Sequence, residues 1–222
     1  GKMKGYLEHP RILGLGEVMD APSVINGSVA MHEKLQLFKD RVKDGHAPFL
    51  APGDLAAYVL GGIDTDHECV DYEYAMAEAR NGMQVLIREG SAARNLDAIV
   101  KGIVEHHTDT SGFCFCTDDK HIEEIRKAGH HKYNVKRAVQ LGLPVEKALQ
   151  MATIQPARCY GLYSLGMIAP GRQADFVILD NVTDLNVVDV YHCGKKIIKD
   201  EKAELKPCPP YLKNTVHVSG FS

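Results

Sequence analysis

The sequence lacks the features that assign a protein to a membrane or to the secretory route. It has no apolar run of roughly 18 residues that could cross a bilayer. No basic segment followed by an apolar one opens the chain, as it would in a secretory signal. We therefore expect a cytoplasmic protein that does not enter a membrane.

An excess of positive charge is also missing. The net charge is -3 and the pI is near 6.4. The lysines are spread along the chain and form no basic stripe. Proteins that bind nucleic acid concentrate basic residues on one face, so we expect no nucleic-acid partner.

The six cysteines form no CxxC pair and no framework of the kind that staples small secreted domains. We expect reduced thiols in the core. Cys114 and Cys116 are two residues apart and would share one face of a strand. They are either a pair of soft metal ligands or two small core residues, and the absence of a matching pair favours the core.

Five short apolar runs, each followed by a helical pattern, fill the first 150 of the 222 residues. Between the runs, apolar residues recur at intervals of three and four, as on the buried face of a helix. Pro52 and Asp54 suit the start of one such helix and Pro144 the start of another. Strands that alternate with helices predict a parallel sheet. The runs are "RILGLGE" (11–17), a weak one before "DGHAP" (44–48), "VLGGIDTDHEC" (59–69), "GMQVLIREGS" (82–91) and "SGFCFCTDD" (111–119).

A polar residue stands at the tip of each run, at steps of 29, 21, 22 and 29 residues: Glu17, His46, His67, Glu89 and Asp118. Each step matches one strand, loop, helix and loop. In a (β/α)8 barrel such tips meet at the C-terminal mouth, where active sites are built. The spacing alone does not separate a barrel from an open doubly wound sheet.

The pattern of residue types changes near residue 166. Residues 166–197 alternate β-branched runs with Gly, Pro, Asn and Asp, which predicts short strands of a small β layer. We expect the larger unit over 1–165, the small β unit over 166–200, and a tail or the start of a further region over 201–222.

The tip residues have the chemistry of a hydrolytic metal centre. Two imidazoles and several carboxylates suit Zn, Mn or Fe. Glu17 is the natural bridge between two ions, His46 and His67 are the imidazole ligands, and Asp118 is the partner of a bridging water that loses a proton near neutral pH. Asp119 can shuttle protons or orient Asp118, although neighbours on a strand point to opposite faces unless the strand has ended.

Two further features have two interpretations each. The segment "REGSAARN" (88–95) either holds an anion or substrate at its rim, or is an ordinary helix start. His121 in "DDKH" either reaches the mouth or is a surface residue.

Several motifs together resemble the adenine deaminases of the amidohydrolase superfamily. The shared superfamily patterns are "MATIQPARCYGL" (151–162) and "GMIAPGRQADFVILD" (166–180). "LGEVM" (15–19) also matches, and more specific are "DGHAP", "DHEC", "REGSAARN" and "CTDDKH", which follow in the same order up to residue 121. The resemblance covers about residues 11–197.

The resemblance implies an α/β fold: part of a (β/α)8 barrel plus part of a small β-sandwich, with one or two divalent ions such as Mn, Fe or Zn. It implies hydrolysis of adenine to hypoxanthine and ammonia. Glu17, His46, His67 and Asp118 match the metal ligands, and Asp118 takes the proton from water. Residues that match motifs with roles in proton transfer or purine contact are Asp119, Glu89, Arg88, Ser91 and His121.

This chain departs from that pattern because it has no HxH pair of a first barrel strand; "EHP" at 8–10 does not match. We expect a piece of a larger enzyme that is inactive alone, and its open sheet edges favour self-association into a homo-oligomer. Two alternatives remain: another cyclic amide or amidine hydrolase of the superfamily, and a non-catalytic relative that binds a metal or a partner.

Overall fold

The computed structural model describes residues 2–197 and 209. Five parallel strands form one sheet in the sequential order β1-β2-β3-β4-β5. They are β1 (Gly14–Val18), β2 (Val42–Gly45), β3 (Thr65–Asp66), β4 (Gln84–Arg88) and β5 (Phe113–Cys116). The predicted strands are confirmed.

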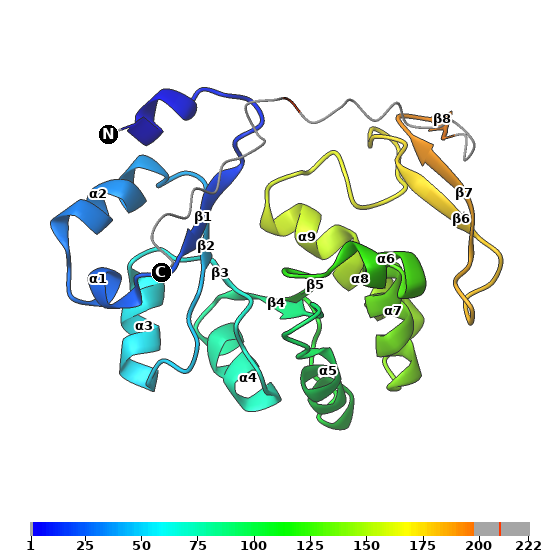
Figure 1. Ribbon diagram of the computed structural model, residues 1–222, viewed down its shortest axis with the longest axis horizontal. Coiled ribbons are helices and arrows are strands. Elements are labelled where there is room, and N and C mark those ends of the chain that lie inside the picture. The colour runs from blue at the N-terminus through cyan, green and yellow to red at the C-terminus, as the bar shows by residue number, and fades with distance from the viewer. Residues whose placement is uncertain (1, 198–208, 210–222) are drawn as a thin grey trace, which may run out of the picture.

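Helices follow every strand and fan around the outside of the sheet (Figure 1). A sequential strand order with helices on one side is the arrangement of a barrel wall, whereas a doubly wound sheet reverses its order. The structure therefore decides between the two folds that the spacing left open. The helices are α1 (Ala21–Ile25), α2 (Val29–Leu37), α3 (Pro52–Leu60), α4 (Tyr72–Arg80), α5 (Leu96–Glu105), α6 (Ile122–Ala128), α7 (His131–Gln140), α8 (Val145–Ala152) and α9 (Ile154–Cys159), preceded by a 3-10 turn at Lys2–Tyr6.

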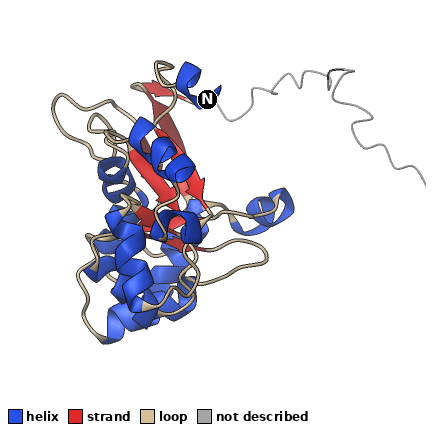
Figure 2. Ribbon diagram, turned by 90° about the vertical axis from the view of Figure 1, so that its left-hand side faces the viewer, coloured by secondary structure: helices blue, strands red, loops and turns tan. Residues whose placement is uncertain are grey.

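The buried helix faces have the periodicity that the sequence predicted. In α5, Leu96, Ile99, Val100 and Ile103 are buried against β4 and β5. Each such side chain stabilises the fold by about 1.5–3 kcal/mol relative to exposure. Figure 2 shows helices packed against the strands. The strand tips are thereby held on a rigid wall.

Three helix boundaries differ from the sequence prediction. The pattern "VAMHEKLQLFKDRVK" (29–43), one of the helical patterns between the apolar runs, predicts one helix. That helix, α2, ends at Leu37, because Val42 pairs with Gly14 in the sheet. The single helix expected from Pro144 breaks at Thr153 into α8 and α9. Pro144 is the N-cap of α8 and not a first-turn residue, whereas Pro52 starts α3 as predicted.

A separate antiparallel sheet follows, with β6 (Phe176–Leu179), β7 (Val187–His192) and β8 (Lys195–Lys196). Its strands lie where the small β layer was predicted. The expected tail over 201–222 falls outside the described residues, apart from Pro209. No helix in the described part of the chain is long and apolar enough to cross a membrane.

Candidate metal centre

The carboxyl ends of the five strands carry the predicted polar residues to one edge of the sheet. Glu17 lies near the end of β1, Arg88 ends β4, and the other three stand in the loops that follow β2, β3 and β5: His46, His67 and Asp118. Parallel neighbouring strands bring such tips side by side. Residues that are distant in the sequence therefore share one site.

Glu17, His46 and His67 form a cluster whose candidate ligand atoms all lie within 4.8 Å of one another. His67 Nε2 is 3.3 Å from Glu17 Oε1, and the two imidazole rings are 5.6 Å apart between centroids. Buried His46 Nδ1 has no hydrogen-bond partner among the described residues. Two imidazole nitrogens, one of them free to coordinate, and a carboxylate are a fitting donor set for a divalent transition metal.

The backbone at two of these tips is unusual. Glu17 has a φ of 26° and Asp118 a φ of 46°. Positive φ is uncommon for residues other than glycine and costs of order 1–3 kcal/mol, and it concentrates at functional sites. The register between β1 and β2 also shifts between Leu15 and Val18, beside Glu17. The pairing of β1 with β2 is thus irregular at the position where Glu17 turns towards the cluster.

Glu68 lies beside the cluster and contacts both of its histidines, and the sequence prediction missed it. Its Oε1 lies 3.4 Å from His67 Nε2 and 3.5 Å from His46 Nδ1. Strand alternation would send neighbouring residues to opposite faces, but β3 ends at Asp66, so both residues of the following loop turn inward. The acid next to the histidine in "TDHEC" was the signal available in the sequence.

Arg88 joins the cluster to β5. Its guanidinium contacts both oxygens of Glu68, with NH2 to Oε2 at 3.0 Å, and its NH1 lies 3.2 Å from Asp118 Oδ2. Burial lowers the pKa of Arg88, but the two carboxylates outweigh it and hold the pKa above its ordinary value. This pairing holds Glu68 beside the histidines and ties Asp118, which lies outside the cluster, to the same guanidinium.

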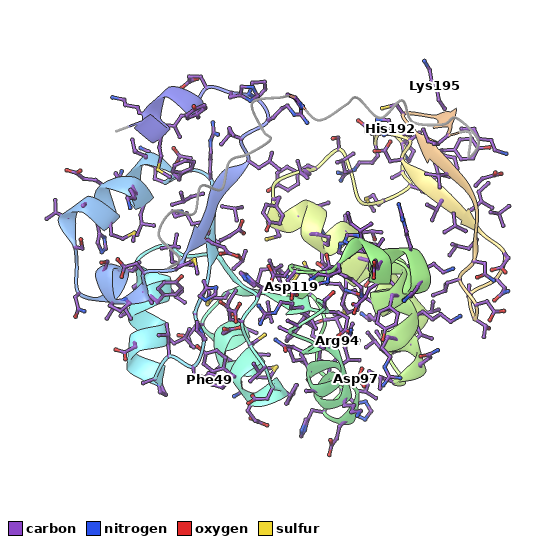
Figure 3. All side chains as sticks on the ribbon, in the orientation of Figure 1. Phe49, Arg94, Asp97, Asp119, His192 and Lys195 are labelled. Atoms are coloured by element: carbon purple, nitrogen blue, oxygen red, sulfur yellow. The ribbon has the colours of Figure 1, made fainter. Side chains whose placement is uncertain are left out.

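The two adjacent aspartates point to different partners. Asp118 faces Arg88, whereas Asp119 accepts hydrogen bonds from the backbone N–H groups of Ser91 at 3.1 Å and Ala92 at 2.9 Å. Those two bonds, Ala92 first, lower the pKa of the Asp119 carboxyl. Figure 3 shows Asp119 where β4 and β5 end. Its geometry favours support of the loop, and its part in proton transfer stays a prediction.

Comparison with known proteins identifies the family. Residues 6–204 match the amidohydrolase family. This chain belongs to the amidohydrolase family. Amidohydrolases are generally metal-dependent, in agreement with the donor set at the strand tips.

Three relatives of this amidohydrolase are named adenine deaminase. It is 58% identical over 221 residues to the protein of Desulfitobacterium hafniense, 43% over 203 residues to that of Kosmotoga olearia and 38% over 227 residues to that of Lysinibacillus sphaericus. These alignments cover 100%, 90% and 99% of this chain but only 39%, 35% and 39% of the relatives. The chain therefore spans about two fifths of the length of these curated relatives, and it is homologous to that part of them.

Solved structures share the fold at low identity. The β-aspartyl dipeptidase of Fervidobacterium islandicum matches with a TM-score of 0.66 and 15% identity, over 89% of this amidohydrolase and 61% of the dipeptidase. The N-acetyl-D-glucosamine-6-phosphate deacetylase of Mycobacterium smegmatis matches with a TM-score of 0.61 and 20% identity, over 82% and 54%. At these identities the likeness supports the barrel fold alone.

The segment "REGSAARN" of this amidohydrolase is mostly a loop before α5, and only its last residue, Asn95, belongs to the helix start. The helix begins at Leu96 with Asn95 as its N-cap, so Ser91 does not cap it. The Ser91 hydroxyl instead donates to Glu124 at 2.9 Å and accepts from the His121 backbone N–H at 2.8 Å. The loop does bind an anion, and that anion is the chain's own Asp119. Substrate contact by Ser91 or by exposed His121 stays a prediction.

Glu89 lies apart from the cluster, because it follows Arg88 on the opposite face of β4. It is buried and lines a cavity of about 570 Å³ together with Arg94, Asp97 and Arg137. Burial raises the pKa of the Glu89 carboxyl, and Lys120 and Arg94 oppose that shift. The structure therefore does not bring Glu89 together with Glu17 and the two histidines, and its catalytic role stays a prediction.

Gly90 provides the space for Asp119, which yields a test. A Cβ built on Gly90 would stand 1.7 Å from Asp119 Oδ1. We expect Gly90→Ala to displace the aspartate and to destabilise the protein by about 1–3 kcal/mol, as overpacking does. Urea unfolding measures the loss. The control is Gly53→Ala, where a Cβ meets nothing within 4 Å; equal stability of the two variants would contradict the packing role.

Proposed function

We propose that this chain supplies the C-terminal half of the active centre of an adenine deaminase, which hydrolyses adenine to hypoxanthine and ammonia. The observation that carries the proposal is the convergence of Glu17, His46 and His67 within 4.8 Å at the C-terminal edge of a barrel wall. The 58% identity to a protein named adenine deaminase supports the choice of substrate.

We infer that Glu17, His46 and His67 hold one or two divalent ions, of which Mn, Fe and Zn suit the donors. Such an ion supplies Lewis acidity, which brings the pKa of a water molecule close to neutrality. Asp118, the predicted fourth ligand, lies outside the cluster of Glu17, His46 and His67; it pairs with Arg88, and its side chain is 36% exposed. A substrate that enters the edge of the sheet can therefore reach Asp118.

The residues of this chain account for the proton transfers. Asp118 takes the proton of the water that adds to C6 of adenine, and it returns this proton to the amino group as the C6–N bond breaks. Water is consumed and ammonia leaves, so the carboxylate ends as it began. Arg88 holds Asp118 and Glu68 in register, and Glu68 orients the imidazoles of His46 and His67.

The same proposal extends to the cellular setting, the substrate class and the assembly of the full-length protein. We infer that the full-length protein works in the cytoplasm, takes a small purine as substrate and forms a homo-oligomer. The open edges of the five-stranded sheet support association with further protein, either another part of the same chain or another copy.

The test is ammonia release by the full-length protein, purified without chelator and loaded with Mn, Fe or Zn in parallel. We expect adenine to be the best substrate, with kcat/KM in the enzymatic range of about 10⁴–10⁸ M⁻¹s⁻¹. The chelator-stripped protein is the control and should be inactive until metal returns. If the protein hydrolyses a cyclic amide but not adenine, the assignment as a deaminase is wrong and the alternative hydrolase is favoured. Metal binding without turnover of either substrate would point to a non-catalytic relative.

A further inference from the structure

A buried acid pair lies directly beneath the candidate metal centre. Asp66, at the end of β3, and Glu78, on the inner face of α4, are both fully buried. Their carboxyl oxygens and the thiol of Cys69 lie within 4.8 Å of one another. Two buried carboxylates this close cannot both carry a charge at low cost.

Asp66 fastens together the two loops that carry the histidines. Its Oδ1 accepts from the backbone N–H of Ala47 at 2.6 Å, next to His46. Its Oδ2 accepts from the backbone N–H groups of Glu68 at 2.6 Å and Cys69 at 3.2 Å, next to His67. Three backbone N–H groups therefore donate to the two oxygens of this carboxylate.

Glu78 has no such donors. No N–H or O–H group of the described residues donates to either of its oxygens, which lie beside Asp66 and the Cys69 thiol. No ion pair formed in the described part of the chain includes it. The hydroxyl groups of the nearby Tyr58 and Tyr74 donate hydrogen bonds to the carbonyls of Val18 and Ala47, and so not to Glu78. The proton shared by the acid pair therefore belongs on Glu78.

We propose that Glu78 is a neutral carboxylic acid. Its O–H group donates a hydrogen bond to Asp66 and so positions the loops of His46, His67 and Glu68. Burial first, and then the charge of Asp66, raises the pKa of Glu78 to about 10, in agreement with this assignment. Glu78 is a positioning residue, because it acts on the site only through Asp66. The positioning role rests on the proposed metal centre, whereas the neutral state of Glu78 does not.

The experiment compares Glu78→Gln with Glu78→Leu in the full-length protein. The Gln amide N–H can still donate to Asp66, so we expect metal affinity and kcat to stay within about threefold of the wild type. Leu fills a similar volume without a donor, and we expect metal affinity to fall by about 10–100-fold, the range for loss of an outer-shell partner. Glu73→Gln, an exposed site on the same helix, is the matched control.

Infrared spectroscopy reads the proton directly and needs no activity. The wild type should show the C=O stretch of a neutral, buried carboxylic acid between pH 6 and about 9, and both Glu78 variants should lack it, while Glu73→Gln keeps it. A missing band in the wild type overturns the neutral state, even if Glu78→Leu fails to fold. The positioning role is overturned if Glu78→Gln lowers metal affinity as much as Glu78→Leu does. It is also overturned if a folded Glu78→Leu variant keeps the metal affinity of the wild type. Because the band and the metal affinity are measured without adenine, both results stand apart from the choice of substrate.

Discussion

Replacement of Asp118 by asparagine in the full-length protein should lower kcat by about 10²–10⁴-fold, the contribution of a positioned acid or base. Asparagine keeps the shape of the side chain and its contact with Arg88, 3.2 Å away, but it cannot take a proton from water. Ammonia release from adenine at saturating metal measures kcat, and metal content is measured in parallel. Turnover that survives the substitution would remove Asp118 from the chemistry.

The neighbouring residue is the matched control. Asp119→Asn alters the same loop, yet it changes only the bonds to the N–H groups of Ser91 and Ala92. A hydrogen bond contributes about 0.5–1.5 kcal/mol, so we expect less than about a tenfold change in kcat. If instead Asp119→Asn costs as much as Asp118→Asn, Asp119 takes part in proton transfer, as the sequence pattern suggested.

Glu17→Ala should abolish turnover by a different route, because it removes a ligand and not a base. We expect the bound metal per protein to fall and the affinity for the remaining ion to weaken by more than the roughly 10–100-fold typical of an outer-shell loss. Metal analysis after dialysis, together with ammonia release, measures both effects. Removal of the carboxylate that faces His67 at 3.3 Å is the cause.

Glu73→Ala is the control for Glu17→Ala, since it deletes an exposed carboxylate on α4 that is not part of the cluster. It should leave metal content and turnover unchanged. Full metal content in Glu17→Ala would mean that His46 and His67 bind the ion with ligands other than Glu17. The assignment of Glu17 as the bridge would then be wrong.

The cluster also explains why both imidazoles are held so closely. His46 and His67 approach the same Glu68 oxygen, and Arg88 grips that carboxylate from the other side. Asp66 fastens the backbone beneath them. Three elements of the sheet are thereby tied to one another at the point where a metal would bind, which is how precise sites are built on rigid scaffolds.

The spacing of polar tips in the sequence was sufficient to predict which strands carry the candidate residues. Steps of 21 to 29 residues between Glu17, His46, His67, Glu89 and Asp118 matched one strand and one helix each, and the five strands lie where predicted. Glu89 shows the limit of this argument. It stands at a strand tip in the sequence, yet its side chain lies on the helix side of β4 because the inward position belongs to Arg88.

By itself, the sequence determined the strands, most of the helices and the donor types at the strand tips, because hydrophobic periodicity and residue chemistry are local properties. Only the tertiary structure decided which side chains meet. The end of β3 at Asp66 turned Glu68 inward, the positive φ of Asp118 separated it from Asp119, and the packing of α4 buried Glu78 against Asp66. Each depends on where a strand stops or on which helix face is covered, and those outcomes are set by contacts between residues distant in the chain.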